Sequence, residues 1–225
     1  MKNYVRVNQI VYDDLAKEYQ QKMQEYIISD KKITAPFINY LKNHFDKIRV
    51  LELGPGSGLN LSYFENEGFD TTAIDISKEI LRVSKEMAPK TNYLHEDFLE
   101  FNFSNLKFEG IFAKAFIHLF PKKDAVIALR KIFHLLEEDG IAFIATTIHE
   151  NSDEGFFEKS DYNKKMKRFR KKWTETELLE EVKKVGFVVF DKSYVNVPMP
   201  KTTHFSVWMR HIEHPKIEHH SNRTF

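Results

Sequence analysis

Residues 50–58 read VLELGPGSG, an apolar run that meets three glycines at every second position. The run from Ile48 to Leu53 predicts a buried strand, and the segment after Gly58 can start a helix. Glycine adopts positive φ angles and, because it lacks a Cβ atom, lets a ligand approach the main chain closely. A strand that ends in a glycine turn and leads into a helix is typical of a nucleotide-binding element. We therefore expect the rest of the chain to form a scaffold and a lid around this turn.

The bulk composition limits the class of protein. The chain has 225 residues, 42% of them apolar, which suffices for one well-buried α/β domain. Its formal net charge of +1 gives no global electrostatic argument for binding nucleic acid or a membrane surface. The absence of cysteine excludes disulfides, thiolate nucleophiles and cysteine-ligated metals. Neither a signal-peptide core nor an apolar run of membrane-spanning length is visible, so we expect a cytoplasmic protein.

The hydrophobic pattern predicts alternating strands and helices. Besides the strand at 48–53, we expect strands over 70–74, 92–95, 110–115, 141–147, 187–190 and 204–209. Helices are expected over 8–28, 35–44, 59–66, 77–87, 121–136 and 174–185. This alternation argues for a parallel sheet with helices on both faces and an antiparallel pair at its end. Residues 149–172 are charged and aromatic without a clear period, and we expect an insertion over the carboxyl ends of the strands.

Acidic residues accompany the first three predicted strands. Asp75 ends the second strand, where a carboxylate can accept hydrogen bonds from ribose hydroxyls or simply favour the next helix N-terminus. Asp97 and Phe98 follow the third strand and suit an adenine's amino group and flat face, or an ordinary loop acid and core ring. Glu52 lies near the end of the first strand, where a buried carboxylate is costly unless it meets a cation or donors. Three acids around one glycine turn favour a cationic ligand without phosphates and disfavour NAD, FAD or ATP.

These motifs together resemble the class I S-adenosylmethionine-dependent methyltransferases. The resemblance is carried by ELGPGSG at 52–58, AIDIS at 73–77, EDF at 96–98 and FEGIFA at 108–113, and it covers about residues 10–210. It implies a Rossmann-like three-layer α/β sandwich with a seven-stranded, mostly parallel sheet whose last strand pair is antiparallel. It also implies S-adenosyl-L-methionine as the cofactor and S-adenosyl-L-homocysteine as the product. Glu109 stands where the family commonly has Asp, and Pro55 where many members carry Cys or another small residue.

The resemblance also implies the cofactor-binding residues. The glycine loop would pass under the methionine and ribose groups, and Glu52 would help to hold the methionine end. Asp75 would bind the ribose hydroxyls, and Asp97 the adenine amino group, with Phe98 packed on the ring. The full expected set is Tyr19, Glu52, Gly54, Pro55, Gly56, Gly58, Asp75, Ile76, Asp97, Phe98, Ala113 and Lys114.

Acceptor recognition in this fold is expected to come from segments added to the core. His118 lies in a loop that, by the resemblance, is close to the methyl group, and His149 follows the fifth strand. Either imidazole is a candidate catalytic base, and the alternative role for His118 is to orient the loop. Arginines in the insertion suit an acidic acceptor because a guanidinium forks onto carboxylate or phosphate, whereas most of the lysines are expected to form a solvated face. The expected substrate-binding residues are Tyr12, His118, His149, Tyr162, Arg168 and Arg170.

The resulting hypothesis is methyl transfer from S-adenosylmethionine to an O or N atom of a small molecule, acidic or aromatic, by in-line displacement. Two alternatives stay open: a methyltransferase acting on tRNA or another macromolecule, and a non-catalytic cofactor-binding module or subunit. No metal, nucleic acid or membrane partner is expected, and the chain is expected to be a monomer or homodimer. We expect one methyltransferase domain over 1–225, divided into a helical lid (1–46), cofactor core (47–147), substrate-lid insertion (148–173), C-terminal helix and hairpin (174–210) and tail (211–225).

Overall fold

The computed structural model of the protein describes residues 1–23, 27–159, 164–197 and 202–211. Its centre is a seven-stranded sheet in the order β3-β2-β1-β4-β5-β9-β8. The strands, in chain order, are β1 (Arg49–Leu53), β2 (Asp70–Asp75), β3 (Asn92–His95), β4 (Phe108–Lys114), β5 (Leu136–Ile148), β8 (Val188–Val197) and β9 (Thr202–Arg210). The first five pair in parallel, and β9 runs antiparallel to both β5 and β8. The predicted sheet is confirmed.

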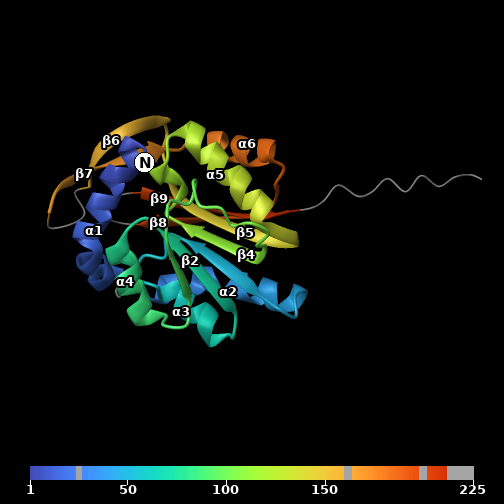
Figure 1. Cartoon of the computed structure of the whole chain (residues 1–225). Coiled ribbons are helices and arrows are strands. Elements are labelled where there is room, and N and C mark those ends of the chain that lie inside the picture. Colours follow the sequence, from blue (N-terminus) through green and yellow to red (C-terminus); the bar gives the residue numbers. More distant parts are fainter. Residues whose placement is uncertain (24–26, 160–163, 198–201, 212–225) are drawn as a thin grey trace, which may run out of the picture.

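Helices cover both faces of the sheet (Figure 1). One layer is formed by α2 (Ile27–His44), α3 (Leu59–Asn66) and α4 (Lys78–Met87), and the other by α5 (Lys122–Leu135) and α6 (Glu175–Val185). The predicted helical lid fits only the first helix, α1 (Asn3–Met23), which packs against α4 and the hairpin strand β7. By contrast, α2 belongs to the helical layer, because its Phe37 and Leu41 are fully buried against Gly110 of β4. No helix among the described residues is long and apolar enough to cross a membrane.

The segment between β5 and α6, where we expected an insertion, has regular secondary structure. It contains an antiparallel hairpin of β6 (Asp153–Lys159) and β7 (Met166–Lys172). Phe156 and Phe169 are cross-strand partners whose rings meet edge to face at 5.6 Å. Charged residues occupy both faces of these strands and obscure the apolar alternation that normally reveals a strand.

Several predicted boundaries also change. The first two helices begin at Asn3 and Ile27 instead of residues 8 and 35. The fifth strand begins at Leu136 and passes through Asp139, which adopts a φ of 60°, where we expected a turn. A β-bulge between Phe108 and Gly110 lets β4 stay paired with this longer strand.

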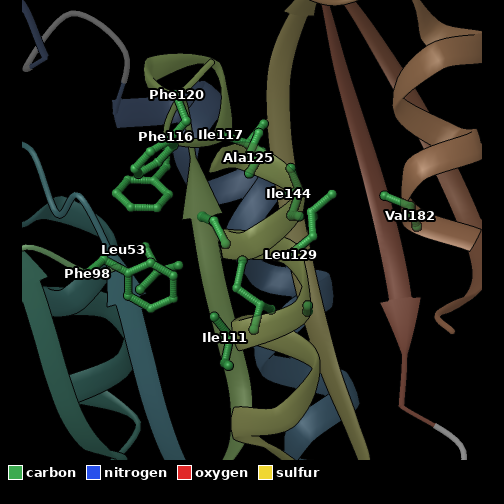
Figure 2. Packing of buried hydrophobic residues seen from close by; sticks show 14 of the residues in the cluster. Leu53, Phe98, Ile111, Phe116, Ile117, Phe120, Ala125, Leu129, Ile144 and Val182 are labelled. Carbon is green, nitrogen blue, oxygen red and sulfur yellow. The ribbon is translucent and has the colours of Figure 1, made fainter. Parts of the chain in front are cut away.

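A hydrophobic cluster lies beneath the carboxyl ends of the central strands. Figure 2 shows Leu53 of β1 near the rings of Phe98 and Phe116, with Phe120 above them. Phe116 meets Phe98 at 5.7 Å and Phe120 at 5.0 Å, both edge to face. These ring contacts hold the loops after β3 and β4 in place next to the glycine turn.

The glycine turn is held tightly against α4. Gly54, Gly56 and Gly58 have φ angles of 70°, 57° and 81°, in the left-handed region that favours glycine. A Cβ atom on Gly58 would lie 2.5 Å from the backbone oxygen of Ser84. Gly58 is therefore required both for its backbone conformation and for the close packing of α3 on α4.

Replacing Gly58 with Ala should destabilise the protein far more than replacing Gly68. Gly68 has a nearly equal φ of 80° but has nothing within 4 Å of its Cβ position. Gly68→Ala should therefore cost only the left-handed strain, about 1–2 kcal/mol, whereas Gly58→Ala adds a clash with backbone. Urea denaturation of both variants measures the difference, and equal free energies of unfolding would contradict the packing argument.

Candidate active site

A small pocket opens over the glycine turn at the carboxyl ends of β1 and β4. Its lining residues are Tyr19, Glu52, Gly54, Pro55, Ser57, Asn60 and Lys114. Tyr19 of α1 covers the turn so closely that a Cβ atom on Gly56 would lie 2.7 Å from its Cε1 atom. The structure therefore brings together the predicted loop residues with Tyr19, Glu52 and Lys114, and only glycine at position 56 leaves room for this arrangement.

Glu52 is held in the pocket by a chain of buried hydrogen bonds. Its side chain is 1% exposed, and its Oε1 accepts a hydrogen bond of 2.9 Å from Asn60 Nδ2. Thr34 Oγ1 of α2 donates at 3.0 Å to Asn60 Oδ1, which turns the amide NH₂ group toward the carboxylate. A carboxylate in such a dry environment favours a cationic partner, such as an ammonium group. Our sequence reasoning missed Thr34 and Asn60, since nothing in the local pattern distinguishes them from ordinary helix residues.

Asp75 lies beside the turn, where its carboxylate has two roles. Oδ1 accepts a hydrogen bond of 2.7 Å from the Ser77 amide, while Oδ2 lies 3.8 Å from the Cβ position of Gly54. The pKa of Asp75 is raised from 3.8 to about 7: burial is the largest cause and the nearby carboxylate of Asp13 adds to it, while the hydrogen bond from the Ser77 amide acts in the opposite direction. Hydroxyl donors on a bound ligand would stabilise the charged form. Both expected roles, ligand acceptor and helix N-terminal acid, fit this position.

Asp13, which we did not predict, connects α1 to the start of α4. Its Oδ1 accepts hydrogen bonds from Ser77 Oγ at 2.6 Å and from the Glu79 amide at 3.2 Å. Ser77 Oγ in turn caps the helix by accepting from the Ile80 amide at 3.1 Å. The lid helix is thereby fixed next to Asp75.

The loop after β3 is anchored to the core. Asp97 Oδ1 accepts a hydrogen bond of 2.9 Å from the Leu99 amide, and Lys131 Nζ of α5 donates to the carbonyl oxygens of Phe98 and Phe101, both at 2.5 Å. Phe98 is only 4% exposed, so it has the core role that we considered for it. Its expected contact with an adenine ring stays a prediction, as does that of Ile76, which packs partly buried against the same cluster.

The loop after β4 turns sharply toward the pocket. Ala113 is 1% exposed and Lys114 lines the pocket, while Ala115 takes a φ of 57° and donates its amide proton to the Ala145 oxygen. His118 follows in the short 3₁₀ helix η2 (Ile117–Leu119), buried, with Nδ1 at 3.1 Å from Thr146 Oγ1 of β5. The loop is therefore fixed to β5 at two points.

His149 lies just beyond β5 in a cationic environment. Its amide donates to the Trp173 oxygen at 2.8 Å, and its Nε2 is buried with no hydrogen-bond partner among the described residues. Burial lowers the pKa of His149 from 6.5, and the charges of Arg170 and Lys172 lower it further. The imidazole is therefore neutral near pH 7 and able to accept a proton.

The hairpin brings two predicted arginines to the same end of the sheet. Arg168 Nη1 donates to the hydroxyl of Tyr12, and Arg170 Nη2 donates to Thr147 Oγ1 at 2.7 Å. Tyr162, the remaining predicted substrate residue, lies outside the described residues. No group of three or more His, Cys, Asp or Glu side chains in the described ranges is arranged to hold a metal ion.

Asn8, which our sequence reasoning also missed, joins α1 to the hairpin and to η2 by hydrogen bonds. The Phe169 amide donates to Asn8 Oδ1 at 2.8 Å, and Asn8 Nδ2 donates to the Leu119 oxygen at 3.2 Å. Asn8 itself is 5% exposed. The three segments that enclose the site are thus joined by one buried amide.

A family model described as a methyltransferase domain matches residues 19–192 of the chain. The chain belongs to this methyltransferase family. It is 31% identical over 147 residues to an uncharacterized methyltransferase of Bacillus mycoides, with 64% of this chain and 68% of that protein covered. It is 29% identical over 134 residues to a glycine/sarcosine N-methyltransferase of Aphanothece halophytica, with 56% of this chain but only 50% of that protein covered. The class I S-adenosylmethionine-dependent family that we predicted is confirmed.

Among solved structures, the methyltransferase resembles the 1,6-didemethyltoxoflavin-N1-methyltransferase of Burkholderia thailandensis bound to 1,6-didemethyltoxoflavin and S-adenosylhomocysteine. The TM-score is 0.66 at 18% identity, and the match covers 95% of this chain and 92% of the other. This similarity confirms the fold. The pocket itself fits the cofactor, because a glycine turn without room for side chains is flanked by Glu52 and Asp75, acceptors for an ammonium group and for hydroxyls.

Asn60→Ala should weaken binding of S-adenosylhomocysteine about 10-fold or more, because a hydrogen bond to a charged group contributes about 1.5–3 kcal/mol. The same variant should bind 5′-methylthioadenosine as the wild type does, since this ligand lacks the amino-acid group that Glu52 is expected to hold. Ser62→Ala is the matched control on α3, because Ser62 Oγ donates to the Leu59 oxygen of its own helix and to no other group in the described ranges. Calorimetric titration measures all affinities, and equal losses for both ligands would contradict the role of Glu52.

Asp75→Asn should stabilise the ligand-free protein at high pH. The pKa of Asp75 is raised from 3.8 to about 7, so the folded state keeps its proton more tightly than the unfolded state does. That contribution to stability is fully present below about pH 4 and is lost as the pH rises to about 7. The advantage of the variant should therefore grow from pH 5 to 7, reach at most a few kcal/mol, and stay constant to pH 8.

The same substitution should lower the affinity for S-adenosylhomocysteine by about 10-fold or more at pH 8, because a neutral amide is a weaker acceptor for hydroxyls than a carboxylate. Urea denaturation at several pH values and calorimetry measure the two effects. Glu96→Gln, at an exposed acid near the same edge, is the control. A pH-independent difference in stability or an unchanged affinity would refute this account of Asp75.

Proposed function

We propose that this methyltransferase moves a methyl group from S-adenosylmethionine to an oxygen or nitrogen atom of a small-molecule acceptor. The observation that carries the proposal is the pocket over the glycine turn, with Glu52 and Asp75 beside it and α1 above it. The hairpin of β6 and β7 and the helix η2 are joined to α1 by Asn8, and this close arrangement supports a small acceptor over a large one.

When bound, the cofactor supplies a methyl carbon on a sulfonium: a lone pair of the acceptor forms the new bond to carbon while the carbon–sulfur bond breaks and its electron pair stays on sulfur. The protein's residues hold the two reactants in line and keep water out. Such positioning can contribute about 7–11 kcal/mol to lowering a barrier. Tyr19 and the turn at Gly56 would line one side of the bound reactants, and the loop that carries Lys114 would line another side.

An acceptor that carries a proton must lose it, and we favour His149 over His118 as the base. The Nε2 atoms of both histidines are buried and do not distinguish them, but the lowered pKa of His149 keeps its imidazole neutral. His118 already uses Nδ1 in its contact with Thr146, which suits a role in orienting the loop. General base catalysis typically contributes about 10²–10⁴-fold to the rate.

A large nucleic-acid substrate is less well supported than a small acceptor. Lysines of the hairpin that could contact phosphates are engaged in ion pairs: Lys164 with Asp14 at 2.6 Å, Lys165 with Glu158 at 3.5 Å and Lys172 with Asp153 at 3.5 Å. Together with the net charge of +1, this pairing gives no continuous basic surface along the hairpin.

Calorimetric titration with S-adenosylhomocysteine, with NADH as the control ligand, tests the proposal first. We expect micromolar affinity for the former and no heat from the latter. Incubation with methyl-labelled S-adenosylmethionine and a panel of small amines, phenols and carboxylic acids then tests transfer, with a bulk tRNA preparation as the competing substrate class. No binding of S-adenosylhomocysteine, or label transferred only to tRNA, would overturn the proposal.

With an acceptor in hand, His149→Gln should lower kcat by about 10²–10⁴-fold and leave the affinity for S-adenosylhomocysteine unchanged. The wild-type rate should fall at acid pH with a midpoint below 6.5, because the folded environment lowers the pKa of His149. A His149→Gln enzyme with full kcat would exclude this residue as the base.

A further inference from the structure

Arg168 is a buried cation whose only hydrogen-bond partner in the described part of the chain is a neutral phenol. Arg168 is 8% exposed, and its Nη1 donates to the hydroxyl of Tyr12. The guanidinium carbon lies 5.7 Å from the centre of the Tyr12 ring. No carboxylate in the described ranges forms an ion pair with it. A largely buried guanidinium is stabilised by an anionic partner, so this environment favours an anionic ligand.

The neighbouring cations of the hairpin do not share this property. Lys171, the other deeply buried cation on β7, pairs with Glu177 at 2.9 Å. The more exposed Lys164, Lys165 and Lys172 each pair with a carboxylate as well. These four lysines therefore have carboxylate partners close by, in contrast to the buried Arg168.

Arg170 adds a second guanidinium to the same face of β7. Residues two apart on a strand point to the same side and lie about 7 Å from each other. Arg170 donates to Thr147 Oγ1 at 2.7 Å. The charge of Arg170 also contributes to lowering the pKa of His149, which shows that the end of β5 lies in a positive field.

The spacing of two tyrosines on α1 indicates how far Arg168 lies from the glycine turn. Tyr19 touches Gly56, and Tyr12 touches Arg168. Both tyrosines pack against one cluster formed by Ala16 with Ile80 and Val83 of α4, so they share one face of α1. Seven residues of helix rise about 10 Å, which is the length of a small acceptor molecule.

We propose that the acceptor is a small acid whose oxyanion, a carboxylate or a phosphate, is bound by Arg168 with Arg170 beside it. This inference rests on the proposed methyl transfer, since it names the class of its acceptor. The anion completes the environment of Arg168 by a forked, charge-assisted pair of hydrogen bonds. The nucleophilic atom of the acceptor then lies at the other end of the molecule, toward the glycine turn.

Ligand-observed NMR with benzoate, phenyl phosphate and the neutral analogue benzamide tests the inference, each with and without S-adenosylhomocysteine. Wild-type protein should bind at least one anion more tightly than benzamide, and the preferred anion distinguishes a carboxylate from a phosphate. Arg168→Gln should weaken that binding about 10-fold or more and leave the affinity for S-adenosylhomocysteine unchanged. Lys167→Gln, which removes the same charge from the adjacent, exposed position, should change nothing.

Thermal unfolding of Arg168→Met provides an independent readout. If Arg168 serves to bind an anion, its charge has no anionic partner in the ligand-free protein. Met is of similar length and uncharged, so Arg168→Met should leave Tm unchanged or raise it by a few degrees. A clear fall in Tm, weaker binding of the anions than of benzamide, or equal effects of Arg168→Gln and Lys167→Gln would overturn the inference. Failure of S-adenosylhomocysteine to bind would instead overturn the proposed function, because the anions are also tested in its absence.

Discussion

The structure depends on keeping two carboxylates, Glu52 and Asp75, in a poorly hydrated position at the ends of adjacent strands. The register of β1 and β2, with Leu53 opposite Ile74, brings them to the same edge of the sheet. Removing a carboxylate from water is unfavourable, so the surrounding chain supplies donors: Asn60 to Glu52 and the Ser77 amide to Asp75. The raised pKa of Asp75 shows that this compensation is partial in the ligand-free protein. Keeping these carboxylates in the binding site therefore lowers the stability of the ligand-free protein.

The same constraint explains why α1 is fixed by polar as well as apolar contacts. Asp13 caps α4 through Ser77, and Asn8 binds the backbone of Phe169 and Leu119. Apolar packing alone is non-directional and would allow the helix to slide, whereas these hydrogen bonds set its position along the sheet. Tyr19 then reaches Gly56, and Tyr12 reaches Arg168, from a single rigid element.

The sequence predicted those features that rest on local chemistry. The glycine spacing, the apolar strands and Asp75 at a strand end identified the fold and the cofactor edge, because each has a short-range pattern with a physical reason. Thr34, Asn60, Asn8 and Asp13 could not be found this way, because their partners are distant in the chain and polar helix residues have no distinctive period. The hairpin was missed for a related reason: the many Lys and Arg residues on β7 conceal that Arg168 and Lys171 are buried.

A net charge of +1 conceals a separation of charge within the site. The cofactor end carries Glu52 and Asp75, which favour cations and donors, while the acceptor end carries Arg168, Arg170 and the positive field around His149. In a medium of low effective dielectric constant, each end would attract a ligand of opposite charge more strongly than water allows. A cationic methyl donor and an anionic acceptor would therefore each be oriented by its own end of the site. With its anion held at Arg168, the acceptor would then direct its nucleophilic end toward the glycine turn, where the methyl donor is expected.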